Sequence, residues 1–446
     1  MDLLKQIFDA GVVGAGGAGF PTHKKISGQT RLLLVNAAEC EPLLCSDRFV
    51  MRNFAAEIIE ALVAVKDEFQ IPRVIIGTKQ KYTREIAALK KEIEARGAGI
   101  EFSAVSSFYP AGDEQVLIYE ATGETVPPSG IPPMLGIAVI NVTTALNIGR
   151  AMKGIPVTRR YITVNGAVGS PVIVGAPVGA KLSDVINAAG GAAVNPCTII
   201  KGGPMMGPQF PMSEAEALVI GKADGGLVVL PESHPLIQFS RKPLEHMINQ
   251  AKSVCIQCSY CTEMCPRYLI GHRLRPNRVM RSMATGTCET DLADALLCCE
   301  CGVCELFACP MQLSPRKMNI HVKGLLREKG IKVAGQTVYE AQAEPREYRR
   351  VSQNRIIGRL GLGEYPTELE HVVPLELEEV RVPLKHGVGK PAVPVVKAGD
   401  RVEAGEPVAG VEFADVGCMV HASIAGVVTA VDEFGVTIRR GEEGAR

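Results

Sequence analysis

The sequence predicts a multidomain α/β protein, and three observations support this fold class. The chain has 446 residues, more than a single hydrophobic core usually organises. Residues 30–150 alternate strand-like and helical runs, whereas ten of the fourteen cysteines lie between Cys255 and Cys309. From Lys385 onward the chain returns to short β-like runs separated by glycine. We therefore expect several modules of different architecture.

The first module, residues 1–155, is predicted to be a layered α/β domain. Apolar strand-like runs alternate with segments of helical periodicity at the spacing that is typical of a mainly parallel sheet covered by helices. The expected strands lie at 31–37, 73–78 and 100–106, and the expected helices at 51–69 and 79–96.

Four further segments follow the first domain. In 156–232, two short strands joined by a glycine-rich turn and followed by a helix predict a small α+β module. Residues 245–330 hold the clustered cysteines among helix-forming residues. We expect a linker over 331–384, with one helix near 350–360. The glycine-punctuated runs of 385–446 predict a small barrel or sandwich.

Composition and charge exclude several classes of protein. Lysine plus arginine (48) balance aspartate plus glutamate (48), so charge favours neither nucleic acid nor an anionic membrane as a partner. Apolar stretches such as Ile137–Val142 are much shorter than a membrane-spanning helix. The N-terminal residues do not have the basic, apolar and small-residue regions of an export signal. We expect a cytoplasmic protein that does not span a membrane.

Eight cysteines form two motifs that predict two 4Fe–4S clusters. In the bacterial ferredoxin run, three closely spaced thiolates bind one cluster and the fourth binds the other. The first motif has this x2-x2-x3 spacing followed by Pro266, and the second differs by one residue in its last gap. The exchange rule predicts one set of Cys255, Cys258, Cys261 and Cys309, and a second set of Cys298, Cys301, Cys304 and Cys265.

Zinc is the alternative occupant of a four-cysteine site. Structural zinc sites typically take their thiolates from two separated C-x2–4-C knuckles, not from three cysteines at x2-x2 spacing. The spacing therefore favours clusters. Cys299 lies beside Cys298, but using it instead would leave one residue before Cys301 and break the motif.

A glycine-rich loop at residues 14–19 is the first candidate for ligand binding. It formally satisfies G-x-G-x-x-G, in which glycines let backbone N–H groups approach a phosphate. A dinucleotide fingerprint follows a strand and opens a helix, whereas here a helical segment precedes and Phe20-Pro21 follows. We therefore expect a phosphate-binding loop rather than a Rossmann NAD site.

Polar groups also follow three strand-like runs of the first domain, at 35–42, 109–114 and 141–144. In α/β sheets, ligands bind at the ends of such strands. The alternative is that each segment is only a turn with a helix cap.

Taken together, these segments resemble a known flavin-binding signature. GAGGAGFP, VNAAECEP followed by Asp47-Arg48, YPAGDE and NVTT are similar to the segments around FMN in the NADH-oxidising subunit of respiratory complex I and the C subunit of the Rnf complex. The segment from Val164 to Gly179 resembles the β-grasp-like SLBB module of these proteins, and the cysteine motifs resemble their ferredoxin module. The resemblance implies non-covalent FMN, with NADH as the electron donor.

The same resemblance implies which residues contact the flavin. The phosphate side would be formed by Gly14, Gly16, Gly17 and Gly19. Around the ribityl chain and the ring it implies Lys25, Asn36, Glu39, Asp113, Glu114, Asn141 and Thr144. Glu41 matches a residue on the nicotinamide side.

Module order narrows the resemblance. The Rnf subunit places its barrel-like segment first, whereas here it comes last, as in the cobalamin reductases of propanediol-utilisation microcompartments. This order implies an oxidoreductase that reduces corrin cobalt through FMN and two clusters, for reactivation of a B12-dependent pathway. Cobalamin or a cobalamin adenosyltransferase would be its partner, and a microcompartment its location. The C-terminal segment resembles a carrier domain without the lysine that holds a prosthetic group, which implies a barrel-sandwich-like docking or structural module.

Two alternatives remain open. The chain could be a soluble Rnf C-type electron-input subunit that serves another acceptor, such as ferredoxin or a reductase. It could also be a non-enzymatic, cluster-bearing scaffold.

Overall fold

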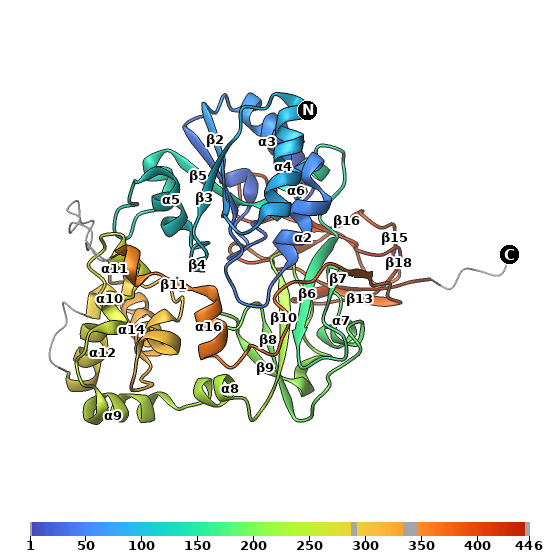
Figure 1. The fold of residues 1–446 in the computed structure, drawn as a ribbon. Coiled ribbons are helices and arrows are strands. Elements are labelled where there is room, and N and C mark those ends of the chain that lie inside the picture. The colour runs from blue at the N-terminus through green and yellow to red at the C-terminus, as the bar shows by residue number, and fades with distance from the viewer. Residues whose placement is uncertain (1, 287–291, 333–345, 442–446) are drawn as a thin grey trace.

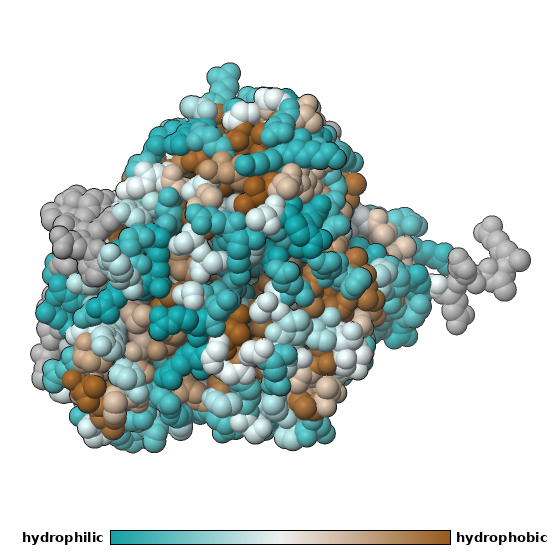
Figure 2. Space-filling model, in the orientation of Figure 1, coloured by the Kyte–Doolittle hydropathy of each residue, from teal (hydrophilic) through white to brown (hydrophobic). Residues whose placement is uncertain are grey.

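The computed structural model of the chain describes residues 2–286, 292–332 and 346–441. Figure 1 shows the N-terminal domain in blue at the top, a helical region in yellow at the lower left and a β-rich region in green at the lower right. The C-terminal module, in red, lies beside the β-rich region. On the face shown in Figure 2, hydrophilic and hydrophobic residues are interspersed. No described helix is long and apolar enough to cross a membrane.

A four-stranded parallel sheet forms the centre of the N-terminal domain. Its order is β3-β2-β1-β5, so the carboxyl ends of all four strands lie at one edge. The strands are β1 (Leu32–Ala37), β2 (Arg73–Lys79), β3 (Glu101–Val105) and β5 (Ile137–Asn141).

Helices cover both faces of this sheet. They are α1 (Leu3–Asp9), α2 (Ser46–Asn53), α3 (Ala55–Glu68), α4 (Thr83–Arg96), α5 (Glu114–Thr122) and α6 (Val142–Ala151). In β1, Leu33 and Val35 enter the core shared with α3 and α6, whereas Leu32 and Leu34 enter the core shared with α5. A strand buried on both faces needs a continuous apolar run, which explains the sequence LLLV.

The single helix expected at 51–69 is two helices, α2 and α3. The chain leaves helical geometry at Phe54, which has φ −128° and ψ 26°. The Phe54 ring then stacks on Tyr161, with ring centroids 5.3 Å apart, and meets the Phe49 ring edge-on. This packing against the next module explains why the helical periodicity in the sequence continues across a break in the backbone.

The β-rich region is a six-stranded mixed sheet in the order β12-β7-β6-β10-β8-β9. Its strands up to Pro231 are β6 (Arg159–Gly166), β7 (Val172–Pro177), β8 (Cys197–Lys201), β9 (Gln209–Pro211) and β10 (Gly226–Pro231). Helix α7 (Leu182–Asn187) packs Leu182, Val185 and Ile186 onto one face. The predicted pair of strands followed by a helix is therefore present, within a larger sheet.

The helical region consists of short helices around the cysteines. They are α8 (Pro235–Ser240), α9 (Leu244–Val254), α10 (Tyr260–Glu263), α11 (Pro266–Leu269), α12 (Pro276–Thr285) and α14 (Pro315–Glu328), with a 3-10 turn at Asp294–Leu297 and a π turn at Val303–Ala308. Met247, Met280 and Met318 fill the core between α9, α12 and α14.

The predicted linker over 331–384 must be corrected, because its described part adds strands to three sheets. Residues 333–345 lie outside the described residues. After them come α15 (Arg346–Arg349), β11 (Val351–Ser352), α16 (Gln353–Arg359), β12 (Val372–Pro374) and β13 (Glu379–Pro383). Strand β11 pairs with β4 (Phe108–Tyr109), β12 with β7 and β13 with β19 (Gly435–Arg439). These strands are too short for their periodicity to stand out among charged residues.

The C-terminal module therefore begins before residue 385, with β13. It has one sheet in the order β13-β19-β18-β15 and a smaller one in the order β14-β16-β17. The remaining strands are β14 (Val393–Pro394), β15 (Arg401–Val402), β16 (Pro407–Gly410), β17 (Val420–His421) and β18 (Gly426–Val431). Val382, Val408, Val420 and Val436 form its core between the two sheets.

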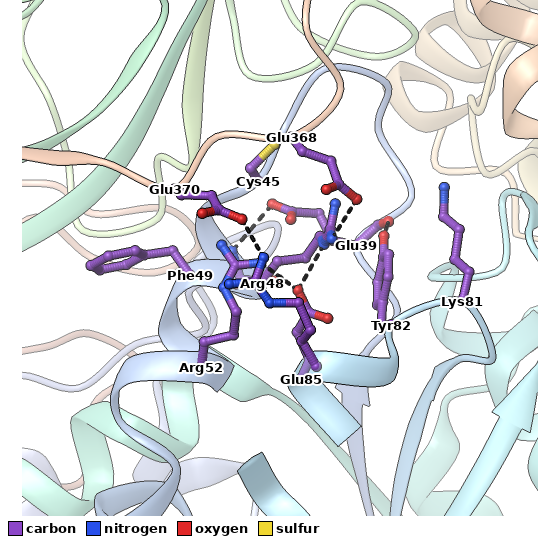
Figure 3. Close-up of polar contacts among 12 residues, drawn as sticks. Glu39, Cys45, Arg48, Phe49, Arg52, Lys81, Tyr82, Glu85, Glu368 and Glu370 are labelled. Carbon is purple, nitrogen blue, oxygen red and sulfur yellow. Dashed lines mark hydrogen bonds and ion pairs between the residues drawn. The ribbon is translucent and has the colours of Figure 1, made fainter. Parts of the chain in front are cut away.

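An ion-pair network attaches the segment before β12 to the N-terminal domain. Figure 3 shows Arg48 and Arg52 of α2 directed at Glu85 of α4, with Nε–Oε1 and Nη1–Oε1 distances of 3.0 and 2.5 Å. Arg48 also binds Glu368 at 2.8 Å and lies over the ring of Tyr82. Glu85 is only 1% exposed, so its charge depends on the two arginines.

Candidate functional site

A cavity of about 450 Å³ lies at the carboxyl edge of the parallel sheet. This volume is within the usual range for small-molecule sites. The ends of β1 and β5, the glycine loop and residues 131–133 line it. Among the residues predicted from sequence, the lining includes Gly14, Gly16, Gly17, Gly19, Lys25, Asn36, Glu114, Asn141 and Thr144.

The glycine loop is held in place by hydrogen bonds to its surroundings. Gly14 N donates to Phe20 O at 2.9 Å, and Ala15 N donates to Thr144 Oγ1 at 2.9 Å. A Cβ at Gly16 would lie 2.6 Å from Asn141 Nδ2, so the loop can approach α6 this closely only with glycine there. The loop therefore lies at the N-terminus of α6, where backbone N–H groups favour an anion.

Positive side chains also line the cavity. Lys24 and Lys25 both line it, and Lys25 Nζ is 3.7 Å from Glu114 Oε2 across the cavity. Lys24 adjoins the predicted Lys25 but carries no motif signal of its own in the sequence. A glycine loop with two lysines fits the phosphate of a mononucleotide.

Two asparagines form fixed polar walls. Asn36 Nδ2 donates to Gly112 O at 2.8 Å. Asn141 Oδ1 accepts from Thr143 N at 2.8 Å as the N-cap of α6, and its Nδ2 donates to Asp47 Oδ2 at 2.7 Å. Because their partners hold them, both amides present a defined face to a ligand.

Glu39 lies behind these walls and does not line the cavity, contrary to the position implied by its segment. Its Oε1 accepts from Ser46 Oγ at 3.1 Å and from Asp47 N at 3.3 Å, while Oε2 is buried without a partner among the described residues. Burial, and then the nearby Asp47, raise the pKa of Glu39 to about 8. Burial also raises the pKa of Asp47. A carboxyl that stays protonated at neutral pH can be buried here.

Glu41 and Asp113 are the other two predicted residues that the structure places outside the cavity. Glu41 Oε2 accepts from Met205 N at 2.9 Å, and burial raises the pKa of Glu41 to about 7. Asp113 caps α5 and forms an ion pair with Arg267 of α11, at 2.9 Å. Contacts between modules, which are invisible in a single segment, direct both carboxylates away from the cavity.

The C-terminal module covers the outer side of the glycine loop. Val388 N donates to Ala18 O at 2.9 Å. A Cβ on Gly19 would lie 2.9 Å from Gly387 Cα, and a Cβ on Gly387 would clash with the Ala18 carbonyl. The two backbones can therefore approach this closely only because each has a glycine at the contact.

The structure gathers the first predicted cysteine set around one cavity, whereas the second set lies among further thiols. Cys255, Cys258, Cys261 and Cys309 line one small cavity. The buried thiol of Cys304 interacts with those of Cys298, Cys261 and Cys265, while the thiol of Cys301 interacts first with that of Cys299 and then with those of Cys265 and Cys304. In the described part of the chain, no three histidine, cysteine or acidic side chains are close enough to share one metal ion. Two quartets of separated thiols match the donor set of two cuboidal clusters.

The second cysteine set lies against the N-terminal domain. Tyr109 Oη donates to the Cys301 carbonyl at 2.7 Å, and Tyr109, Cys301 and Leu43 share one hydrophobic core. Cys309 and Cys255 instead pack among Met247 and other residues of the helical region. One set therefore contacts the N-terminal domain, whereas the other lies within the helical region.

Comparisons with known protein families agree with this architecture. Residues 7–150 match the Nuo51 FMN-binding domain, 161–209 the SLBB domain, 254–314 a 4Fe–4S dicluster domain and 366–444 the RnfC barrel sandwich hybrid domain. The predicted fold class is therefore confirmed, and so are FMN and 4Fe–4S clusters as cofactors. The individual contact and ligand residues stay predictions.

Two curated relatives and one solved structure show how far the similarity extends. Cobalamin reductase PduS of Salmonella typhimurium is 40% identical over 99% of this chain and 97% of its own length. In Acetobacterium woodii, the C subunit of the Na⁺-translocating ferredoxin:NAD⁺ oxidoreductase complex is 32% identical over 60% of this chain and 58% of its own. An NAD⁺-reducing NiFe-hydrogenase structure in the H2-reduced state matches with a TM-score of 0.50 and 18% identity, covering 74% of this chain and 62% of that one, which shows the fold alone.

Proposed function

Since the chain belongs to the PduS family of cobalamin reductases, which are oxidoreductases, we propose that it reduces the corrin cobalt of cobalamin with electrons from NADH. The observation that carries this proposal is the 40% identity to PduS over nearly the full length of both chains. The similarity includes the C-terminal position of the barrel-sandwich module, because it extends over 99% of this chain.

The residues supply binding and positioning rather than acid–base chemistry. When bound, FMN would supply hydride acceptance and single-electron release, and each 4Fe–4S cluster would supply one-electron transfer. The glycine loop would hold the flavin phosphate together with Lys25, which the family resemblance places at the ribityl chain and ring, and Asn36 and Asn141 would fix the polar side of the cavity. Glu41 lies between Tyr109 and Met205, where it closes the contact of the N-terminal domain with the other modules.

Two clusters per chain are proposed, one for each cysteine quartet. The set with Cys301 adjoins the N-terminal domain and is the flavin-proximal set, while the set with Cys258 is the distal one. This arrangement supports a one-electron path that leads away from the flavin cavity toward the acceptor. The family resemblance further supports cobalamin or a cobalamin adenosyltransferase as partner, and a cytoplasmic location inside a microcompartment.

The test is an anaerobic assay of the purified holoprotein with NADH. We expect NADH to reduce the protein and the reduced protein to reduce cob(III)alamin. Cys258→Ser and Cys301→Ser should impair cobalamin reduction but spare NADH oxidation by an artificial acceptor that takes electrons from the flavin. Cys197→Ser, which changes a cysteine in β8 outside both quartets, is the matched control. If both activities fall together in a folded, flavin-replete variant, the proposed order is wrong.

The rival function is that of an Rnf C-type input subunit, favoured by the 32% identity to the Acetobacterium woodii protein. Under that alternative the wild type reduces ferredoxin well and cobalamin not at all. A protein that binds its clusters but accepts no electrons from NADH would instead be the non-enzymatic scaffold.

A further inference from the structure

Arg267 is a buried cation beside the flavin-proximal cysteine set. It follows Cys265-Pro266 in the first turn of α11 and is 8% exposed. Its Nη2 donates to Asp113 Oδ2 at 2.9 Å. Its Nε and Nη1 are buried and have no hydrogen-bond partner among the described residues.

These unpaired donors require an explanation. Arginine stays charged and carries five N–H donors, and buried donors in folded proteins are nearly always satisfied. If Arg267 served only to join two modules, its ion pair with Asp113 would be sufficient. The remaining buried N–H groups would then have no role. The guanidinium also interacts with the thiol of Cys299, which is not a predicted ligand, and then with that of Cys265, so it lies on the side of the proposed cluster.

Asp113 places this arginine next to the flavin cavity as well. The residues on either side of Asp113, Gly112 and Glu114, both line that cavity. Asp113 Oδ1 accepts from the N–H groups of Gln115 and Val116, so the carboxylate is held rigidly as the N-cap of α5. The ion pair between Asp113 and Arg267 therefore connects the wall of the flavin cavity to the helix that begins directly after the proposed ligand Cys265.

We propose that Arg267 donates its free N–H groups to sulfur atoms of the cluster held by Cys265, Cys298, Cys301 and Cys304, and thereby raises the reduction potential of that cluster. This inference rests on the cluster ligation stated under the proposed function. Hydrogen bonds to cluster sulfurs and nearby charge are among the factors that set such potentials, since reduction adds one negative charge. Arg267 is thus a positioning and tuning residue that favours electron entry into the flavin-proximal cluster.

The experiment is an anaerobic redox titration of the holoprotein, followed by EPR, with dithionite as the reductant. Neither NADH nor cobalamin is needed, so the result is independent of the physiological donor and acceptor. In Arg267→Gln we expect the electron affinity of one cluster to fall about tenfold, a shift of about 59 mV to lower potential for a one-electron couple. The other cluster should keep its potential, and Arg267→Lys should retain part of the effect.

Two further variants separate tuning from structural support. Arg349→Gln removes an arginine that pairs with Glu263 at 2.8 Å on a partly exposed surface of the same region, and it should leave both potentials unchanged. Asp113→Asn breaks the ion pair but keeps the arginine, so the potential should not fall.

Unchanged potentials in a cluster-replete Arg267→Gln protein would overturn the proposal. So would an equal fall in Asp113→Asn, because the ion pair rather than the N–H donors would then be responsible. If Arg267→Gln loses the cluster, the potential of Arg267→Lys decides.

Discussion

Two neighbouring glycines of the flavin loop can be distinguished by what an added methyl group would meet. A Cβ at Gly16 would press on Asn141, whereas a Cβ at Gly17 meets no atom within 4 Å, yet Gly17 lines the cavity. We expect Gly17→Ala to weaken FMN binding about tenfold, or ~1.4 kcal/mol, by occupying ligand space without straining the protein. Fluorescence titration of the apoprotein with FMN measures the affinity, and thermal unfolding should be unchanged. Gly28→Ala, on an open surface outside the cavity, is the control; equal affinities in both variants would contradict the assignment.

The buried carboxyl of Glu39 predicts a particular pH dependence of stability. Burial raises its pKa to about 8 in the folded protein, above the value of about 4.3 expected for an unfolded chain. Between these values the folded state binds more protons than the unfolded state, so this residue's contribution to stability falls as pH rises and levels off above 8. The substitution Glu39→Gln removes this pH-dependent contribution to stability. Thermal midpoints measured from pH 6 to pH 8 should therefore diverge in favour of the variant; parallel curves would show that Glu39 is ionised throughout.

Individual residues were predictable where local sequence determines their position. The glycine loop and the asparagines that follow β1 and β5 line the cavity as expected, because the strand ends of a parallel sheet share one edge. Glu39, Glu41 and Asp113 lie outside the cavity wall, because their partners come from elsewhere: Ser46, Met205 and Arg267. Single segments do not contain that information.

At the scale of elements, the contact between the C-terminal module and the glycine loop can be tested with two glycines. Gly387 and Gly399 both have positive φ, +80° and +97°, so alanine strains the backbone at either position. Only at Gly387 would the added Cβ clash with the loop, at the Ala18 carbonyl. We expect Gly387→Ala to speed FMN dissociation several-fold more than Gly399→Ala, as measured by flavin release after dilution. Equal rates would mean that the module does not support the loop.

The longer elements followed from the sequence, and the shortest did not. Strands β1 and β2 are continuous apolar runs, and α4 has charged helical periodicity over fourteen residues. Strand β13 has only Val380 and Val382 on its buried face, and β12 has three exposed residues. Pairing with partners about 55 and 200 residues away stabilises these strands, and no local pattern records it.

For the whole molecule, the buried ion-pair network around Glu85 predicts that a single substitution at this residue lowers the free energy of unfolding strongly. Glu85→Gln leaves Arg48 and Arg52 without their shared partner, which should cost about 3 kcal/mol. Arg84→Gln breaks an exposed pair with Glu370 in the same region and should cost less than about 1 kcal/mol. Anaerobic urea unfolding of the two variants makes the comparison. Similar losses in both would indicate that the network is solvated.

The meeting of Gly19 with Gly387 also constrains the order of biogenesis. The flavin loop leaves the ribosome before the backbone that covers it, which is made about 370 residues later. At roughly 5–20 residues per second, the loop waits on the order of tens of seconds for its cover. Stable capture of the flavin therefore has to await synthesis of the C-terminal module, and a nascent chain stalled before that module should exchange its cofactor freely.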